Sequence, residues 1–261
     1  MKIGIIGCGW LGLPLAKHLV ASGHLVTGST TSQNKLPILA AEGIEPVLLK
    51  LDPMPVGEHF QKLLLADALI INIPPGRKKN PPHFYEEQIK YLKYMLANSP
   101  VEQVLFISST SFYPNTNGIV STHTAPDFAR GSSLAVVQAE KQIQQIGQRL
   151  TILRCGGLMG DDRIPGKWFA GKHTTGRDTP VNYVHQQDVI RVVTAILNKS
   201  ISHDPIMNLV SPEHPTRRQV HEAMACKYNF TPPVWEEPHT IPFKRVESNF
   251  SDFGLKSPLE F

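Results

Sequence analysis

The chain has little cysteine, since its 261 residues include three, Cys8, Cys155 and Cys226. Their wide spacing excludes both a disulfide framework and a CxxC metal-binding pair. The chain also lacks a large excess of charge of one sign, because it has 26 basic and 22 acidic residues. Such a mild surplus does not indicate a nucleic-acid partner unless the charges cluster in a patch.

Long apolar runs and a targeting signal are lacking too. No apolar stretch approaches the ~20 residues of a membrane helix, and the start, MKIGIIGCGW, has no secretory cleavage signature. Hydrophobic residues make up 41% of the chain and charged ones 18%, which is typical of a globular core. We therefore expect a soluble, cytoplasmic protein of enzyme size, with no membrane partner.

The first half of the chain alternates short β-branched runs with amphipathic stretches. In the clearest stretch, Leu11, Leu15 and Leu19 share one helical face. Alternation of this kind indicates repeated βαβ units, and therefore an α/β fold with a doubly wound parallel sheet. The strand-like runs are 2–6, 24–28, 46–50, 68–73, 101–108 and 150–155.

The composition changes after residue 158. Residues 161–180 are rich in glycine, proline and charge, which is typical of a long functional loop. Helical patterns follow at 189–197 and 216–227, a strand at 206–210, and an irregular proline-rich tail from 232. We predict a dinucleotide-binding domain at 1–158 and a smaller, interleaved C-terminal substrate lobe at 159–261. Residues 186–210 are expected to return to the first domain.

A GxGxxG motif follows the first strand and opens the first helix. Gly7 permits a tight turn, Gly9 lets a pyrophosphate approach the backbone, and Gly12 allows close strand–helix packing. The helix N-terminus, beginning near Trp10 and Leu11, offers N–H groups and a positive dipole end to phosphates. The motif predicts a Rossmann-type dinucleotide site; the alternative is a glycine turn that only packs.

Small hydroxyl side chains, without a carboxylate, end the second strand. An NAD-preferring site usually has an Asp or Glu here that accepts the ribose 2′-hydroxyl. This chain has Ser29, Thr30 and Thr31 instead, with Lys35 nearby, and these groups can donate to a 2′-phosphate. We therefore predict NADP rather than NAD. The alternative is that Ser29 and Thr30 cap the next helix.

A proline turn closes the fourth strand. Ligands of such sheets lie beyond the carboxyl ends of the strands, so Ile73, Pro74 and Pro75 are expected to flank the cofactor. A plain proline turn is the alternative. No spacing of the 11 histidines forms a metal site, because His221-Glu222 lacks the second histidine of HExxH.

Four further segments, 106–113, 153–160, 184–189 and 166–172, extend the pattern over nearly the whole chain. Together with the glycine loop, they resemble the extended short-chain dehydrogenases/reductases, the NAD-dependent epimerase/dehydratase family. The likeness is greatest to an atypical bacterial subgroup of the YeeZ type. It implies that Ser108, Gly157 and Leu158 also bind the cofactor, and that Ser109 polarises the substrate.

The resemblance also reveals a departure from the family pattern. The family transfers a proton with a tyrosine four residues before a lysine, whose charge lowers the tyrosine pKa. Here Ser132 stands at the tyrosine position and Val136 at the lysine position, and no YxxxK lies between residues 113 and 150. Tyr113 could replace the catalytic tyrosine or, as in the family, have a packing role.

Basic residues gather in the long loop and after the proline turn. Such cations suit an anionic substrate resembling a nucleotide-sugar, although ordinary solvated charges are the alternative. Asn182 and His185 lie in the segment that closes the substrate side in the family, where His185 is either a substrate donor or a buried core histidine. The basic residues are Arg163, Lys167, Lys172, His173 and Arg177, with Arg77, Lys78 and Lys79.

These features predict an NADP-dependent oxidoreductase or epimerase-like enzyme on a small-molecule substrate, with a non-standard acid or base. A non-catalytic NADP-binding sensor is the second hypothesis, and a protein-interaction module that keeps only the fold is the third. By analogy with relatives, residues 81–97 and 134–146 could form a helical homodimer interface.

Overall fold

The computed structural model describes residues 1–76, 80–201 and 204–260. They form two compact, interleaved units. Unit 1 comprises Met1–Ser108, Ser133–Leu153 and Val192–Ile206, and unit 2 comprises Ser109–Ser132, Arg154–Arg191 and Met207–Phe261. The division into a domain at 1–158 and a lobe at 159–261 stays a prediction, and the contacts group residues 109–132, 154–191 and 207–261 in unit 2.

The fold is built around an eight-stranded sheet, whose strands lie in the order β12-β8-β6-β5-β1-β2-β3-β4. β1 pairs in parallel with both β2 and β5, so the chain order reverses beside β1. Ligands of doubly wound sheets bind at such a point. The α/β fold with a doubly wound sheet is thus confirmed. The strands are β1 (Lys2–Ile6), β2 (Leu25–Thr30), β3 (Glu45–Asp52), β4 (Met54–Glu58), β5 (Ala68–Ile71), β6 (Gln103–Ser109), β8 (Arg149–Cys155) and β12 (Ile206–Leu209).

The edge strand β4 is one element that sequence reasoning missed. It pairs antiparallel with β3, and the two strands are joined at Asp52, Pro53 and Met54. Its sequence, MPVGE, contains a proline and a glycine, which are depleted in strands. Proline is tolerated on an edge strand, where one side of the ladder is unpaired.

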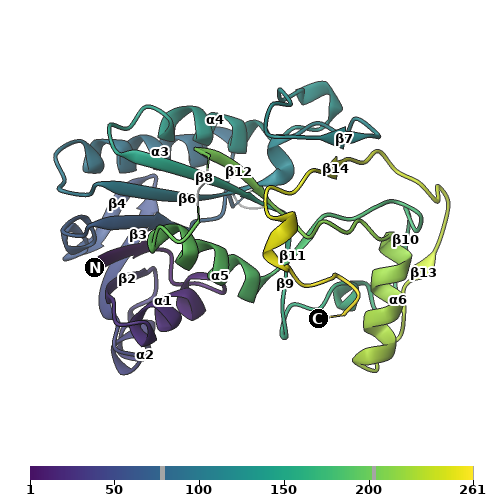
Figure 1. Ribbon diagram of the computed structural model, residues 1–261, viewed down its shortest axis with the longest axis horizontal. Coiled ribbons are helices and arrows are strands. Elements are labelled where there is room, and N and C mark those ends of the chain that lie inside the picture. Colours follow the sequence, from purple (N-terminus) through teal and green to yellow (C-terminus); the bar gives the residue numbers. More distant parts are fainter. Residues whose placement is uncertain (77–79, 202–203, 261) are drawn as a thin grey trace. The chain divides into compact units, whose positions relative to one another are not determined.

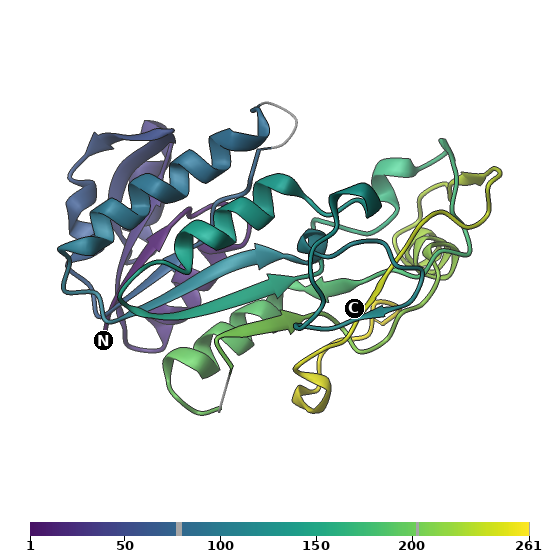
Figure 2. The ribbon, with the colours of Figure 1, turned by 90° about the horizontal axis from the view of Figure 1, so that it is seen from above.

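Helices cover both faces of the sheet. Figure 1 shows α3 (Pro82–Ala97) and α4 (Leu134–Ile143) on one face, and α1 (Gly12–Ala21) and α2 (Leu36–Ala41) on the other. Figure 2 shows α3 and α4 side by side. Helix α5 (Gln186–Leu197) runs from unit 2 into unit 1.

Each helix buries the face that its apolar spacing defines. On α1, Leu15 and Leu19 are fully buried, as their one-turn separation predicts. On α3 and α4, buried side chains at the same spacing form one core with the sheet. Burial of each such leucine or isoleucine stabilises the fold by ~1.5–3 kcal/mol.

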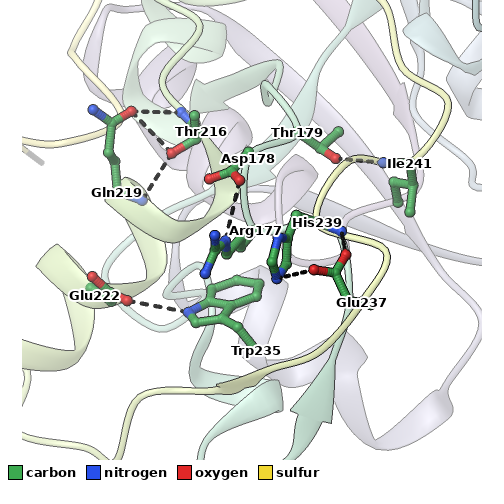
Figure 3. A network of polar contacts seen from close by, with 10 residues as sticks. All are labelled: Arg177, Asp178, Thr179, Thr216, Gln219, Glu222, Trp235, Glu237, His239 and Ile241. Atoms are coloured by element: carbon green, nitrogen blue, oxygen red, sulfur yellow. Dashed lines mark hydrogen bonds and ion pairs between the residues drawn. The ribbon is translucent and has the colours of Figure 1, made fainter.

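Unit 2 is built from short strand pairs and one longer helix. Its proline-rich tail contributes two strands, β13 and β14, whereas the sequence predicted an irregular tail. Helix α6 (Arg217–Lys227) begins at Thr216, whose side chain forms a capping box with Gln219 (Figure 3). The pairs are β7 (Ile119–Val120) with β14 (Arg245–Val246), β9 (Gly157–Met159) with β11 (Tyr183–His185), and β10 (His173–Thr174) with β13 (Val234–Trp235).

The start of α5 anchors the C-terminal segment within unit 2. The buried carboxylate of Asp188 accepts hydrogen bonds from the Arg191 guanidinium and from the Lys256 backbone N–H. Arg191 also donates to the carbonyls of Phe253 and Gly254. Among the described residues, no helix is long and apolar enough to cross a membrane.

Candidate functional site

The glycine turn of unit 1 connects β1 to α1, and two of its glycines are sterically required. Gly7 has φ +103°, and a Cβ there would lie 2.3 Å from the Asn72 carbonyl oxygen. A Cβ on Gly12 would lie 2.1 Å from the carbonyl oxygen of Gly7. Both positions therefore exclude any larger residue, as the motif predicts for a tight turn and close strand–helix packing.

Gly9 differs from its two neighbours in the motif. It is exposed, and a Cβ built on it would meet nothing within 4 Å. The first turn of α1 follows directly, with Leu11 at the N-cap, and no side chain caps it. An open approach in front of a helix N-terminus is the arrangement that binds a pyrophosphate through backbone N–H groups. The residues present therefore fit the diphosphate of a dinucleotide.

The hydroxyl residues at the end of β2, and just after it, divide into two groups. Ser29 is 2% exposed, and its Oγ accepts a hydrogen bond from the Gly7 backbone N–H at 2.9 Å. Thr30 is also buried, and its Oγ1 accepts from the Ser32 N–H at 3.3 Å. Thr31 and Lys35, by contrast, are exposed. Exposure thus separates Thr31 and Lys35, which face solvent, from Ser29 and Thr30, whose hydroxyls bond to the protein backbone.

The proline turn after β5 is held from within unit 1. The hydroxyl of Tyr85, a buried residue of α3, donates to the Ile73 carbonyl at 3.1 Å. Pro74 is exposed, and Pro75 is half-buried. Arg77, Lys78 and Lys79, predicted as substrate-facing cations, lie outside the described residues.

A buried carboxylate near the end of β6 was not anticipated from the sequence. Ser108, predicted as a cofactor contact, is buried, and its Oγ donates to Glu140 Oε1 at 2.5 Å. Burial, and then the charge of Glu140, raise the pKa of Tyr85 above its usual value. Glu140 lies one helical turn after Val136 on α4, and so on the same helix face. This four-residue spacing from the expected lysine position was the signal in the sequence that could have indicated Glu140.

The residues expected to perform chemistry lie at the end of β6 and in the chain that follows it, where Ser109 and Ser132 belong to unit 2 and Val136 to unit 1. Ser109 is half-buried, and its Oγ accepts from the Ser111 N–H at 3.1 Å, which leaves its proton able to donate. Ser132 accepts from the Asp127 N–H at 2.9 Å. Val136, at the expected lysine position, is a buried core residue of α4. Neither Ser132 nor Val136 supplies a cation for proton transfer.

Tyr113 is fully buried in a polar network of unit 2. Its hydroxyl donates to Asn208 Oδ1 at 2.6 Å and accepts from Arg154 Nη1 at 2.7 Å. The Arg154 guanidinium also lies 3.5 Å from the centroid of the Phe112 ring. This geometry favours the packing role of Tyr113 over the acid–base role.

We expect Tyr113→Phe to lower the free energy of unfolding by ~1–3 kcal/mol, because it leaves buried groups of Arg154 and Asn208 without this hydroxyl. Dinucleotide affinity should be unchanged. Urea unfolding and ligand titration measure the two effects, with the exposed Tyr94→Phe as the matched control. Loss of turnover at normal stability would instead assign Tyr113 to the chemistry.

The basic residues of the long loop are less available than the sequence suggested. His173 Nδ1 lies 2.7 Å from Glu236 Oε1, at hydrogen-bond distance. Arg177 pairs with Asp178 at 3.2 Å (Figure 3). Lys172 donates to the Trp168 carbonyl. Arg163 and Lys167 are exposed.

Two other predicted substrate residues have their polar groups engaged by backbone atoms. The side chain of Asn182 donates to the Lys244 carbonyl at 2.9 Å and accepts from the Val246 N–H at 2.8 Å. His185 is buried, its Nδ1 accepts from the Gln187 N–H, and burial lowers its pKa. These hydrogen bonds to the backbone are typical of residues with a structural role.

Two predicted cofactor contacts lie on a short strand of unit 2. Gly157 is exposed and Leu158 half-buried on β9, in unit 2. Cys8 is buried in the glycine turn, and burial raises the pKa of its thiol to about 12, so it is a small packing residue rather than a reactive thiolate. Within the described parts of the chain, no group of three metal-ligating side chains occurs.

Comparison with known proteins now identifies the family. The sequence model of the NAD(P)H-binding family matches residues 7–200, starting at the first glycine of the turn. The chain belongs to this family. It is also 34% identical over 235 residues to Protein YeeZ of Escherichia coli (strain K12), covering 89% of this chain and 85% of that protein. The resemblance to the YeeZ-like subgroup is therefore confirmed.

Solved structures share the fold at lower identity. MoeE5, in complex with UDP-glucuronic acid and NAD, has a TM-score of 0.76 at 16% identity, covering 98% of this chain and 92% of that one. The NAD-dependent NDP-hexosamine 5,6-dehydratase TunA has a TM-score of 0.75 at 15% identity, covering 99% and 94%. This NAD(P)-binding chain thus has the fold of the epimerase/dehydratase family.

Proposed function

We propose that this NAD(P)-binding protein is an NADP-preferring oxidoreductase or epimerase-like enzyme that lacks the usual tyrosine–lysine pair. The observation that supports it best is the open backbone at Gly9 before the uncapped N-terminus of α1, in a chain of the NAD(P)H-binding family. That turn would hold the pyrophosphate, and the bound dinucleotide would supply or accept a hydride. Ser109 would donate its hydroxyl proton in a hydrogen bond to a substrate oxygen.

The preference for NADP is expected to depend on Lys35. No carboxylate directly follows β2 in the sequence to repel a 2′-phosphate, and Thr31 and Lys35 are both exposed. We expect NADPH to bind more tightly than NADH, and Lys35→Gln to weaken NADPH binding about three- to tenfold while leaving NADH unchanged. Titration by calorimetry measures both, with Lys141→Gln, an exposed lysine of α4, as control. Equal affinities for NADPH and NADH in the unaltered protein would contradict the preference.

The ligands and substrates of the fold relatives support the proposed substrate class better than the contacts of the basic loop do. MoeE5 binds a nucleotide-sugar with NAD, and TunA acts on an NDP-hexosamine. We therefore propose a small, anionic, nucleotide-sugar-like substrate. NADPH oxidation with a panel of carbonyl substrates, including nucleotide-sugars, tests this proposal. Turnover that is lost in Ser109→Ala with cofactor affinity retained would support it.

A sensor is the second candidate, because Ser132 and Val136 replace the proton-transfer pair and neither can titrate near neutrality. Cofactor binding that changes affinity for a partner, with no turnover of any substrate in the panel, would favour this candidate. The same assay thus separates an enzyme with an unusual acid or base from a regulatory dinucleotide-binding protein.

A further inference from the structure

The first glycine of the turn is held by a side chain on each side. Its backbone N–H donates to Ser29 Oγ at 2.9 Å, and its carbonyl accepts from Asn72 Nδ2 at 3.1 Å. Ser29 belongs to β2 and Asn72 follows β5, the two strands that flank β1 in the sheet. Gly7 is therefore held by hydrogen bonds from the sides of both neighbouring strands, and all three residues belong to unit 1.

These two contacts fix the residue with the greatest conformational freedom in the turn. The N–H belongs to the peptide unit before Gly7 and the carbonyl to the peptide unit after it, so the pair constrains both φ and ψ. The second peptide unit is also held at its other end, because the Cys8 N–H donates to the Ser29 carbonyl at 2.8 Å. Without such contacts, glycine at φ +103° has many alternative conformations.

Both side chains are themselves rigidly placed. Ser29 is 2% exposed on a central strand. The Asn72 backbone N–H donates to the Ile6 carbonyl at 2.9 Å, which continues the pairing of β5 with β1. Asn72 Nδ2 would also lie 3.0 Å from a Cβ on Gly12, so this amide sits beside the first and third glycines together. Ser29 and Asn72 thus hold the glycine turn through their hydrogen bonds to Gly7, and this pair of residues is called the brace below.

We propose that Ser29 and Asn72 are positioning residues that preorganise the turn for a pyrophosphate, rather than ligands of the cofactor. The inference rests on the proposed dinucleotide function. Ser29, which the sequence predicted to contact the cofactor, would then act on the cofactor site indirectly, because its hydroxyl holds Gly7. Preorganisation matters because a turn that is already ordered loses less entropy when the diphosphate binds.

Ser29→Ala and Asn72→Ala test the brace. Each is expected to weaken NADPH and ADP-ribose binding about tenfold, measured by calorimetry well below the unfolding temperature. The double variant should lose less than the product of the single losses, because both contacts act on the same glycine. Ser29→Thr, which keeps the hydroxyl, should restore affinity. Thr27→Ala, two residues earlier on β2, is the matched control and should bind within about twofold of the unaltered protein.

A merely structural role would give a different result. If Ser29→Ala and Asn72→Ala lower the thermal midpoint yet bind NADPH normally at low temperature, the brace is overturned while the proposed function stands. If the unaltered protein binds neither NADPH nor NADH, both proposals fail. Faster amide hydrogen exchange of residues 7–12 in the variants, reversed by NADPH, would support the brace independently.

Discussion

Gly9→Ala is expected to weaken NADPH binding by more than about tenfold while leaving the thermal midpoint unchanged. The added methyl meets no protein atom within 4 Å, so the fold accepts it. It occupies the space through which a pyrophosphate reaches the backbone, so the ligand is displaced from the N–H groups of α1. Calorimetric titration and a thermal melt of the same sample measure the two quantities.

Two other glycines provide the controls. Gly147→Ala also adds a methyl into open space, but far along the chain from the turn, and should change neither quantity. Gly12→Ala places its Cβ 2.1 Å from the Gly7 carbonyl oxygen, and should lower both stability and affinity. Normal NADPH affinity in Gly9→Ala would contradict a pyrophosphate at this turn.

The glycine turn could be predicted from the sequence because its determinants are local. A strand, three glycines at fixed spacing and an apolar helical face lie within the first 21 residues, and each constrains the backbone directly. The parallel sheet was predictable for the same reason, since short apolar runs alternate with helical periodicity. Strand β4 was missed because its residues have low strand propensity and depend on pairing with β3.

The role of Ser29 could not be predicted, because it depends on long-range register. The sequence shows a hydroxyl residue at the end of a strand. Whether its hydroxyl contacts a ligand or the protein depends on the solvent exposure of that side chain, which the sequence does not show. The pairing of Ile5 with Gly28 brings Ser29 beside the turn that follows β1. Similarly, His173 lies next to Glu236 through the pairing of β10 with β13. Partners so distant in sequence leave no local pattern.

The stability of unit 2 is expected to decrease in acid because of His221. This histidine of α6 is 1% exposed and lies between two aromatic rings, Phe169 at 6.0 Å and Trp235 at 5.7 Å between centroids. Within the described residues, neither ring nitrogen has a hydrogen-bond partner. Burial, and then the positive charge of Arg217, lower the pKa of His221 from 6.5 to about 4. The folded protein thus holds the imidazole neutral.

The direction of the pH dependence follows from that difference. Well above pH 6.5 the imidazole is neutral in both states, and His221 adds no pH dependence there. Between pH 6.5 and about 4 the unfolded chain binds a proton that the folded protein does not, so stability falls as the pH is lowered. The expected loss between pH 7 and pH 5 is roughly 2 kcal/mol at 1.36 kcal/mol per pH unit.

His221→Phe keeps a planar ring between Phe169 and Trp235 but cannot bind a proton, so it should remove this part of the acid sensitivity. Urea unfolding at pH 7 and pH 5, followed by tryptophan fluorescence, measures it, because Trp168 and Trp235 both belong to unit 2. His18→Gln, at an exposed position on α1, should keep the unaltered pH dependence. If His221→Phe loses as much stability between the two pH values as the unaltered protein, the proton is taken up elsewhere, and His221 is not the group that makes unit 2 sensitive to acid.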